Sequence, residues 1–116
     1  MNDTATMNEL ATQKCVACDG GTPVLKGRNL EEFAQRLGHG WQVIDEHHLE
    51  KEFEFKDFKE ALAFTNQVGG LAEEQNHHPD IYLSWGQVRV TIWSHKAGGL
   101  TESDFILAAK IESLGQ

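Results

Sequence analysis

Residues 41–55 and 81–93 both alternate apolar with polar side chains, and a short turn divides each stretch into two runs. An acidic turn follows Trp41 and Val43 in the first stretch, and Gly86 marks the turn in the second. A period of two is typical of a strand with one face on a core and the other in water. We therefore predict two antiparallel hairpins, whose apolar faces need a layer of helices to cover them.

Three further segments repeat apolar residues at three- and four-residue spacing, the pattern of an amphipathic helix. The first should follow an N-cap at Asn29 and end at Gly38, the second should run from Asp57 to about Gln75, and the third should follow an N-cap at Thr101. The predicted order is α-β-β-α-β-β-α. We expect an α+β fold, with a four-stranded antiparallel sheet and three helices packed on one face.

A chain of 116 residues fits one domain with a modest core. Because a four-stranded sheet has two open edges, we expect at least a dimer. The formal net charge of −8 would repel a phosphate backbone, which disfavours nucleic-acid binding. No apolar run approaches the roughly 20 residues that span a bilayer, and the polar start lacks the blocks of a signal peptide. A cytoplasmic protein without membrane contact is the expectation.

Residues 1–28 are predicted to be a flexible N-terminal segment, and residues 29–116 a single α+β domain. The segment holds a lone CxxC pair, Cys15 and Cys18, followed by GG and Pro23. Structural zinc usually takes four ligands, and a thioredoxin-like motif needs a helix after the second cysteine. We interpret the thiols as inert, with metal and redox roles as the alternatives.

Histidines and carboxylates gather where predicted elements end. His77 and His78 follow the second helix, with Glu73 about one turn before them, and His95 ends the last strand. Asp104 lies in the first turn of the last helix. Since loops at one rim of a small sheet can bring polar groups together, these side chains could share a pocket.

Several uses compete for such a cluster. Zinc bound by the three histidines is conceivable, but adjacent residues in an extended segment point to opposite sides, and no HExxH spacing is present. Imidazole is the side chain best suited to proton transfer near neutral pH, and surface histidines without a role are the remaining alternative. Asp104 could equally complete a capping box with Thr101. His47 and His48, in the acidic hairpin turn, are interpreted as solvated and without a role.

Seven residues at fixed spacing resemble the sequence signature of the pterin-4a-carbinolamine dehydratases. They are Glu73, His77, His78, Pro79, Trp85, His95 and Asp104. The resemblance extends through Gly40-Trp41, residues 53–64 and the GLTESDF stretch, and covers roughly residues 28–112. The CVACDGGTP segment is similar to the N-terminal extension of bacterial members.

The resemblance implies an α+β fold, assembly as a homodimer or homotetramer, and catalysis that needs no metal or other cofactor. It also implies a hydro-lyase that dehydrates 4a-hydroxytetrahydropterin to quinonoid dihydropterin and water. That step recycles the tetrahydrobiopterin used by aromatic amino acid hydroxylases. The alternative that the family supplies is a protein-binding module without enzymatic activity, acting as a transcriptional coactivator and dimerisation cofactor or as an assembly factor.

The same resemblance assigns roles to residues. His77 and His95 would be the acid/base pair, and His78 would mainly hold the pterin as a third member of the catalytic set. Glu73 and Asp104 would orient imidazoles. Substrate binding would involve His78, Pro79, Tyr82 and Trp85.

Two positions depart from the animal members. Ile81 stands where they have an aromatic residue, so stacking on the pterin would be lost or would pass to Tyr82 or Trp85. Asn76 stands where an acid commonly precedes the histidine pair, which weakens a second carboxylate partner.

Overall fold

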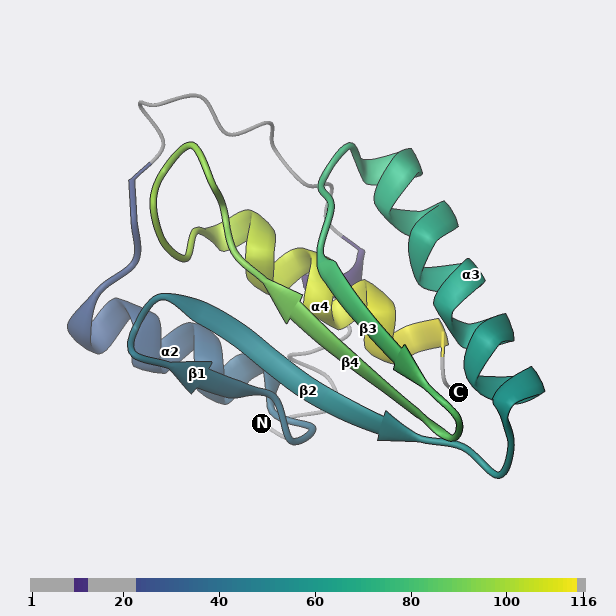
Figure 1. The fold of residues 1–116 in the computed structure, drawn as a ribbon. Helices are drawn as coiled ribbons and strands as arrows, with labels where there is room; N and C mark the ends of the chain where they lie inside the picture. The colour runs from purple at the N-terminus through teal and green to yellow at the C-terminus, as the bar shows by residue number, and fades with distance from the viewer. Residues whose placement is uncertain (1–9, 13–22, 115–116) are drawn as a thin grey trace.

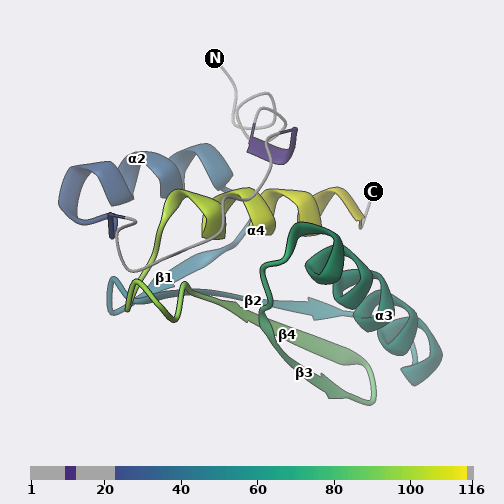
Figure 2. The same ribbon diagram turned by 90° about the horizontal axis from the view of Figure 1, so that it is seen from above.

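The computed structural model describes residues 10–12 and 23–114, and its helices and strands alternate as the sequence predicts (Figure 1). The elements are α2 (Gly27–Leu37), β1 (Gln42–Ile44), β2 (His48–Glu54), α3 (Phe58–Gln75), β3 (Asp80–Ser84), β4 (Gln87–Ile92) and α4 (Glu102–Leu114). All three strand pairings are antiparallel, and the strand order is β1-β2-β4-β3. The helices lie on one face of the sheet (Figure 2). The predicted α+β class and arrangement are confirmed.

The first helix begins earlier than the sequence predicted. Its N-cap is Lys26, which has extended backbone, and the expected cap Asn29 lies exposed inside the helix. The backbone N–H of Leu25 donates to the carbonyl of Leu100 at 2.7 Å, so the chain is held extended until the residue before Gly27. This long-range contact, which the local sequence does not encode, sets the start of α2.

Helix α4 lies between α2 and α3 and is buried on almost every side (Figure 2). The sequence predicted an amphipathic last helix, and that prediction is wrong. Its polar residue Glu112 is buried too, because the carboxylate pairs with the ammonium of Lys51 and accepts a hydrogen bond from the indole of Trp41 at 3.1 Å. A charge inside the core is tolerated when such partners satisfy it.

Part of the N-terminal segment also packs on α4. Leu10 is fully buried in the hydrophobic core, and the carbonyl of Ala11 accepts a hydrogen bond from the ammonium of Lys110 at 2.7 Å. These contacts connect residues 10 and 11 to the core, and the flexibility of residues 1–28 stays a prediction. Cys15 and Cys18 lie outside the described residues.

The sheet turns its other face away from the helices. On that face the guanidinium of Arg89 donates to the carboxylate of Glu52 at 3.0 Å, and it lies 5.5 Å from the ring of Tyr82. None of the helices in the described part of the chain is long and apolar enough to cross a membrane.

The link between β1 and β2 comprises Asp45, Glu46 and His47, and its first two residues take a strained conformation. Asp45 and Glu46 both have φ of 54°, and the N–H of His47 donates to the carbonyl of Ile44 at 2.9 Å. Two central residues with positive φ define a type I′ turn, which matches the twist of a hairpin but favours Asn-Gly or Asp-Gly. A residue with a Cβ pays a steric penalty there, on the order of 1 kcal/mol.

Replacing Glu46 by Gly should therefore stabilise the protein, because the resulting Asp-Gly pair suits this turn. We expect the free energy of unfolding to rise by about 0.5–1 kcal/mol in urea denaturation. The matched control Glu31→Gly, an exposed position inside α2, should lower it by about 1 kcal/mol. A Glu46→Gly variant that is as destabilised as the control would contradict the turn assignment.

Candidate active site

The chain turns sharply after α3, and this turn presents the histidine pair. Asn76 takes the left-handed conformation (φ 52°, ψ 41°), and the N–H of His77 donates to the carbonyl of Ala72 at 3.1 Å. Asn adopts this conformation more readily than most residues that carry a Cβ, so it closes the helix at low cost. Pro79 then keeps the chain extended into β3. Asn76 therefore has a backbone role in place of a second carboxylate.

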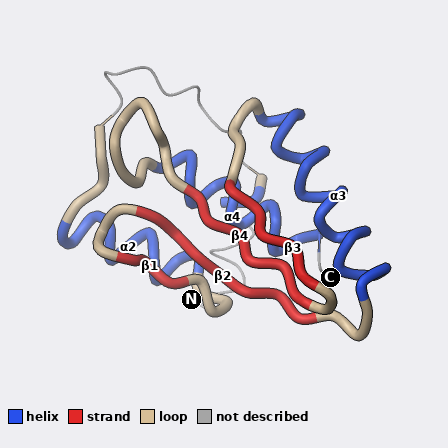
Figure 3. The backbone as a smooth tube through the Cα atoms, viewed as in Figure 1, coloured by secondary structure: helices blue, strands red, loops and turns tan. Residues whose placement is uncertain are grey.

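His95 comes from the end of the central strand β4. The alternation of that strand continues past its last residue, so Ser94 is buried on the helix side and Trp93 and His95 lie on the other side. The links after α3 and after β4 lie at the same end of the sheet, as Figure 3 shows for the two tan segments.

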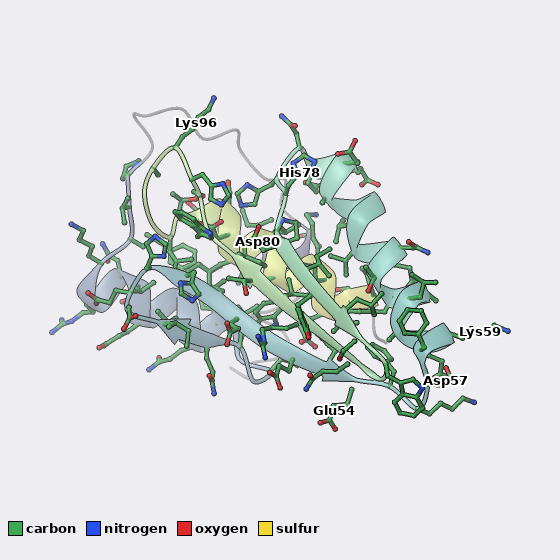
Figure 4. All side chains as sticks on the ribbon, viewed as in Figure 1. Glu54, Asp57, Lys59, His78, Asp80 and Lys96 are labelled. Atoms are coloured by element: carbon green, nitrogen blue, oxygen red, sulfur yellow. The ribbon has the colours of Figure 1, made fainter. Side chains whose placement is uncertain are left out.

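The two links line an open cavity of about 410 Å³. Figure 4 shows His78, Asp80 and Lys96 at this end of the sheet, far from Glu54 and Asp57. All three histidines of the predicted set contribute to its wall. The lining residues are Asn76, His77, His78, Pro79, Asp80, Trp93, Ser94, His95 and Lys96.

One polar contact of the cavity wall joins His77 to a buried carboxylate. The imidazole Nε2 of His77 lies 2.6 Å from Oδ1 of Asp104, whose side chain is fully buried. The second oxygen, Oδ2, accepts hydrogen bonds from the hydroxyl of Ser94 at 2.8 Å and from the backbone N–H of Thr101 at 2.7 Å. Asp104 thus caps α4 and holds His77 at the same time, so its two predicted roles are combined.

The other two histidines are held differently. Nε2 of His78 contacts the carboxylate of Glu73, but both side chains are largely exposed, so the pair adds little stability. The ring of His95 lies 4.1 Å from the indole of Trp93, centroid to centroid, and no carboxylate among the described residues bonds it. Within the described part of the chain, His77 is therefore the one histidine of the three that bonds to a buried carboxylate.

This arrangement suits proton transfer. An imidazole that donates Nε2–H to a buried carboxylate has a fixed tautomer, and its Nδ1 is free to accept a proton from a bound molecule. Among residues 10–12 and 23–114, no group of three or more histidine, cysteine, aspartate and glutamate side chains is placed to hold a metal ion.

A second cavity of about 440 Å³ lies beside β1 and β2 and has no such chemistry. Its wall contains no histidine, and its one lysine, Lys51, is already paired with the buried Glu112. The histidine cavity is therefore the candidate site.

A family model described as Pterin 4 alpha carbinolamine dehydratase matches residues 23–114, a stretch that contains every residue of this cavity. The chain belongs to that family. Two curated relatives carry the name "Putative pterin-4-alpha-carbinolamine dehydratase". The relative from Rubrobacter xylanophilus is 57% identical over 108 residues, 93% of this chain and 100% of the relative. The relative from Alkaliphilus metalliredigens is 52% identical over 106 residues, 91% of this chain and 96% of the relative.

Two solved structures are similar to this member of the dehydratase family. A protein from Brucella melitensis, described as a transcriptional coactivator/pterin dehydratase, is 32% identical, with a TM-score of 0.74 over 81% of this chain and 100% of that one. A pterin dehydratase-like protein, described as a RuBisCO assembly factor in the alpha-carboxysome, is 27% identical, with a TM-score of 0.56 over 66% of this chain and 89% of that one.

Two residues expected to take part in substrate binding, Trp85 from the family signature and Tyr82 as a replacement for the aromatic residue at Ile81, lie outside the cavity. Tyr82 is 58% exposed on the open face of the sheet, and Trp85 is 69% exposed at the β3–β4 turn, the end of β3 opposite to Asp80. The aromatic side chain in the cavity wall is Trp93, which the sequence reasoning missed. Its alternation with His95 along the strand was the available signal.

The buried carboxylate of this dehydratase-family member should be essential for stability. We expect Asp104→Ala to lower the free energy of unfolding by about 2–4 kcal/mol, because it leaves three donors, on His77, Ser94 and Thr101, without their acceptor. Urea denaturation checks this value. The control Glu73→Ala removes an exposed carboxylate and should stay within about 0.5 kcal/mol of the wild type. If both substitutions lowered the free energy of unfolding equally, the different roles assigned to Asp104 and Glu73 would be contradicted.

Proposed function

We propose that this protein is a 4a-hydroxytetrahydropterin dehydratase that works by histidine acid/base catalysis without a metal. The proposal rests on the bond from His77 to the buried Asp104 in a cavity that His95 also lines. Membership of the dehydratase family agrees with it. A cavity of about 410 Å³ is within the usual range for small-molecule sites, so a bicyclic pterin would fit.

The reaction needs one acid and one base. The C4a–O bond of the substrate breaks as an acid protonates the hydroxyl, which leaves as water, and the N5 lone pair forms the new N5=C4a bond. A base then removes the proton from N5, and the product is the quinonoid dihydropterin. No electrons enter or leave, and the proton taken from N5 replaces the one given to the oxygen, so neither a redox cofactor nor a second substrate is required.

His77 is proposed as the base and His95 as the acid. The carboxylate of Asp104 would stabilise the imidazolium that forms when Nδ1 of His77 takes the N5 proton. His95, on the opposite wall of the cavity, would protonate the leaving oxygen. His78 and Pro79 would hold the pterin. The product would return to the tetrahydropterin pool of an aromatic amino acid hydroxylase, and the protein would assemble as a homodimer or homotetramer.

A second candidate function is protein binding. Phe58 and Leu62, one turn apart on α3, are 45% and 41% exposed, and such side chains are common at interfaces. The descriptions of the two structural relatives, a coactivator and an assembly factor, also suggest a role in protein binding. A binding module has no physical need for the buried carboxylate and histidine set, so we favour the enzyme.

Replacing His77 by Gln should lower the dehydration rate of chemically generated 4a-hydroxytetrahydropterin by about 10²- to 10⁴-fold. Gln can still donate a hydrogen bond to Asp104, so the fold should survive, which circular dichroism checks. The matched control is His39→Asn, which removes an imidazole outside the cavity and suits the positive φ of 58° at that position. A His77→Gln variant with full activity would exclude His77 as the base.

Removal of metal ions provides a separate test. Prolonged incubation with a chelator, followed by desalting, should leave the dehydration rate unchanged, because the two histidines supply both proton transfers. Loss of activity that added Zn²⁺ restores would contradict the metal-free mechanism.

A further inference from the structure

The β1–β2 hairpin contacts the wall of the histidine cavity. The ring of His47 lies 4.2 Å from the indole of Trp93, and that indole lies 4.1 Å from the ring of His95, measured between centroids. His47 is half-buried, so its interpretation as a solvated turn residue is wrong. A continuous row of three rings thus joins a turn outside the cavity to the proposed acid.

His47 makes a backbone and a side-chain contact within the turn, besides its packing on Trp93. Its backbone N–H donates to the carbonyl of Ile44 and closes the turn, and its Nδ1 lies 3.1 Å from Nδ1 of His48, a distance at which one ring donates and the other accepts. The turn is maintained although Asp45 and Glu46 carry positive φ, a conformation that is unfavourable for both residues. Strained backbone of this kind often accompanies a functional constraint.

In the described part of the chain, the side chain of His95, unlike that of His47, makes no hydrogen bond that would hold it in place. It lies beyond the last residue of β4, its side chain is exposed, and no carboxylate among the described residues orients it. Trp93 lines the same cavity and packs against the ring of His95. This packing therefore limits the orientation of the His95 ring.

We propose that His47 is a positioning residue: it packs on Trp93 and thereby holds the ring of His95 toward the cavity. Aromatic rings at these separations attract each other and restrict each other's rotation. Only the kinetic part of this proposal rests on the proposed dehydratase function. The geometric part, that loss of the His47 ring reorients His95, stands without it.

The first test compares two substitutions of His47. His47→Ala should lower kcat for dehydration about tenfold and change KM little, because a small misplacement of an acid slows the chemical step more than it weakens binding. His47→Phe keeps a flat ring against the indole and should restore most of kcat. His39→Asn is again the control, since it removes a histidine outside the row.

The second test reads the position of His95 without any substrate. The ring protons of His95 should show an NMR shift from the indole ring current at one fixed pH. Trp93→Leu should abolish this shift, His47→Ala should reduce it, and His47→Phe should keep it. This readout remains decisive if the wild type has no dehydratase activity, which would refute the proposed function alone.

Two results would overturn the proposal. In one, His47→Ala leaves the His95 signals unchanged, whatever happens to the rate. In the other, His47→Phe behaves like His47→Ala in the NMR spectrum, which would mean that a flat ring on Trp93 is not what matters. Reduced His95 shifts in His47→Ala, restored in His47→Phe, would support it.

Discussion

The buried carboxylate of Asp104 joins the fold to the candidate site. One of its oxygens accepts from the backbone of Thr101 and the hydroxyl of Ser94, which fixes the start of α4 against the end of β4. The other oxygen accepts from His77, in the link after α3. One side chain thus holds together the link after α3, the end of β4 and the start of α4. A desolvated charge is tolerated there because its donors and the N-terminus of α4 compensate it.

This arrangement gives the cavity one rigid wall and one that depends on ring packing. His77 is fixed by Asp104, which cannot move without disturbing α4. His95 contacts the row of rings that begins at His47. Catalysis by two groups requires both to be held in productive geometry. The helix cap positions His77 through a hydrogen bond, and the hairpin turn positions His95 through ring packing.

The sheet and its helices were predictable because alternation and helical spacing are local patterns. The four strands, the one-sided helix layer and the meeting of the histidines at one rim all follow from such patterns. Features set by tertiary contacts were missed. No local pattern indicates that Lys51 and Trp41 satisfy Glu112 inside the core, so the sequence predicts a solvent-exposed face on α4. The family signature marks Trp85, which lies in the β3–β4 turn outside the cavity, whereas the alternation of Trp93 with His95 along the strand is a local signal that points to Trp93.

The central claim is that His77, held by Asp104, offers Nδ1 to a pterin in this cavity. Long-range ¹⁵N–¹H spectra of the imidazoles, recorded during titration with a stable oxidised pterin, test it most directly. We predict that His77 carries its proton on Nε2 throughout, and that the signals of His77 and His95 shift together as the pterin binds. The account is contradicted if the His77 proton resides on Nδ1. It is also contradicted if the pterin shifts signals near Trp85 or Lys51 and leaves both histidines unchanged.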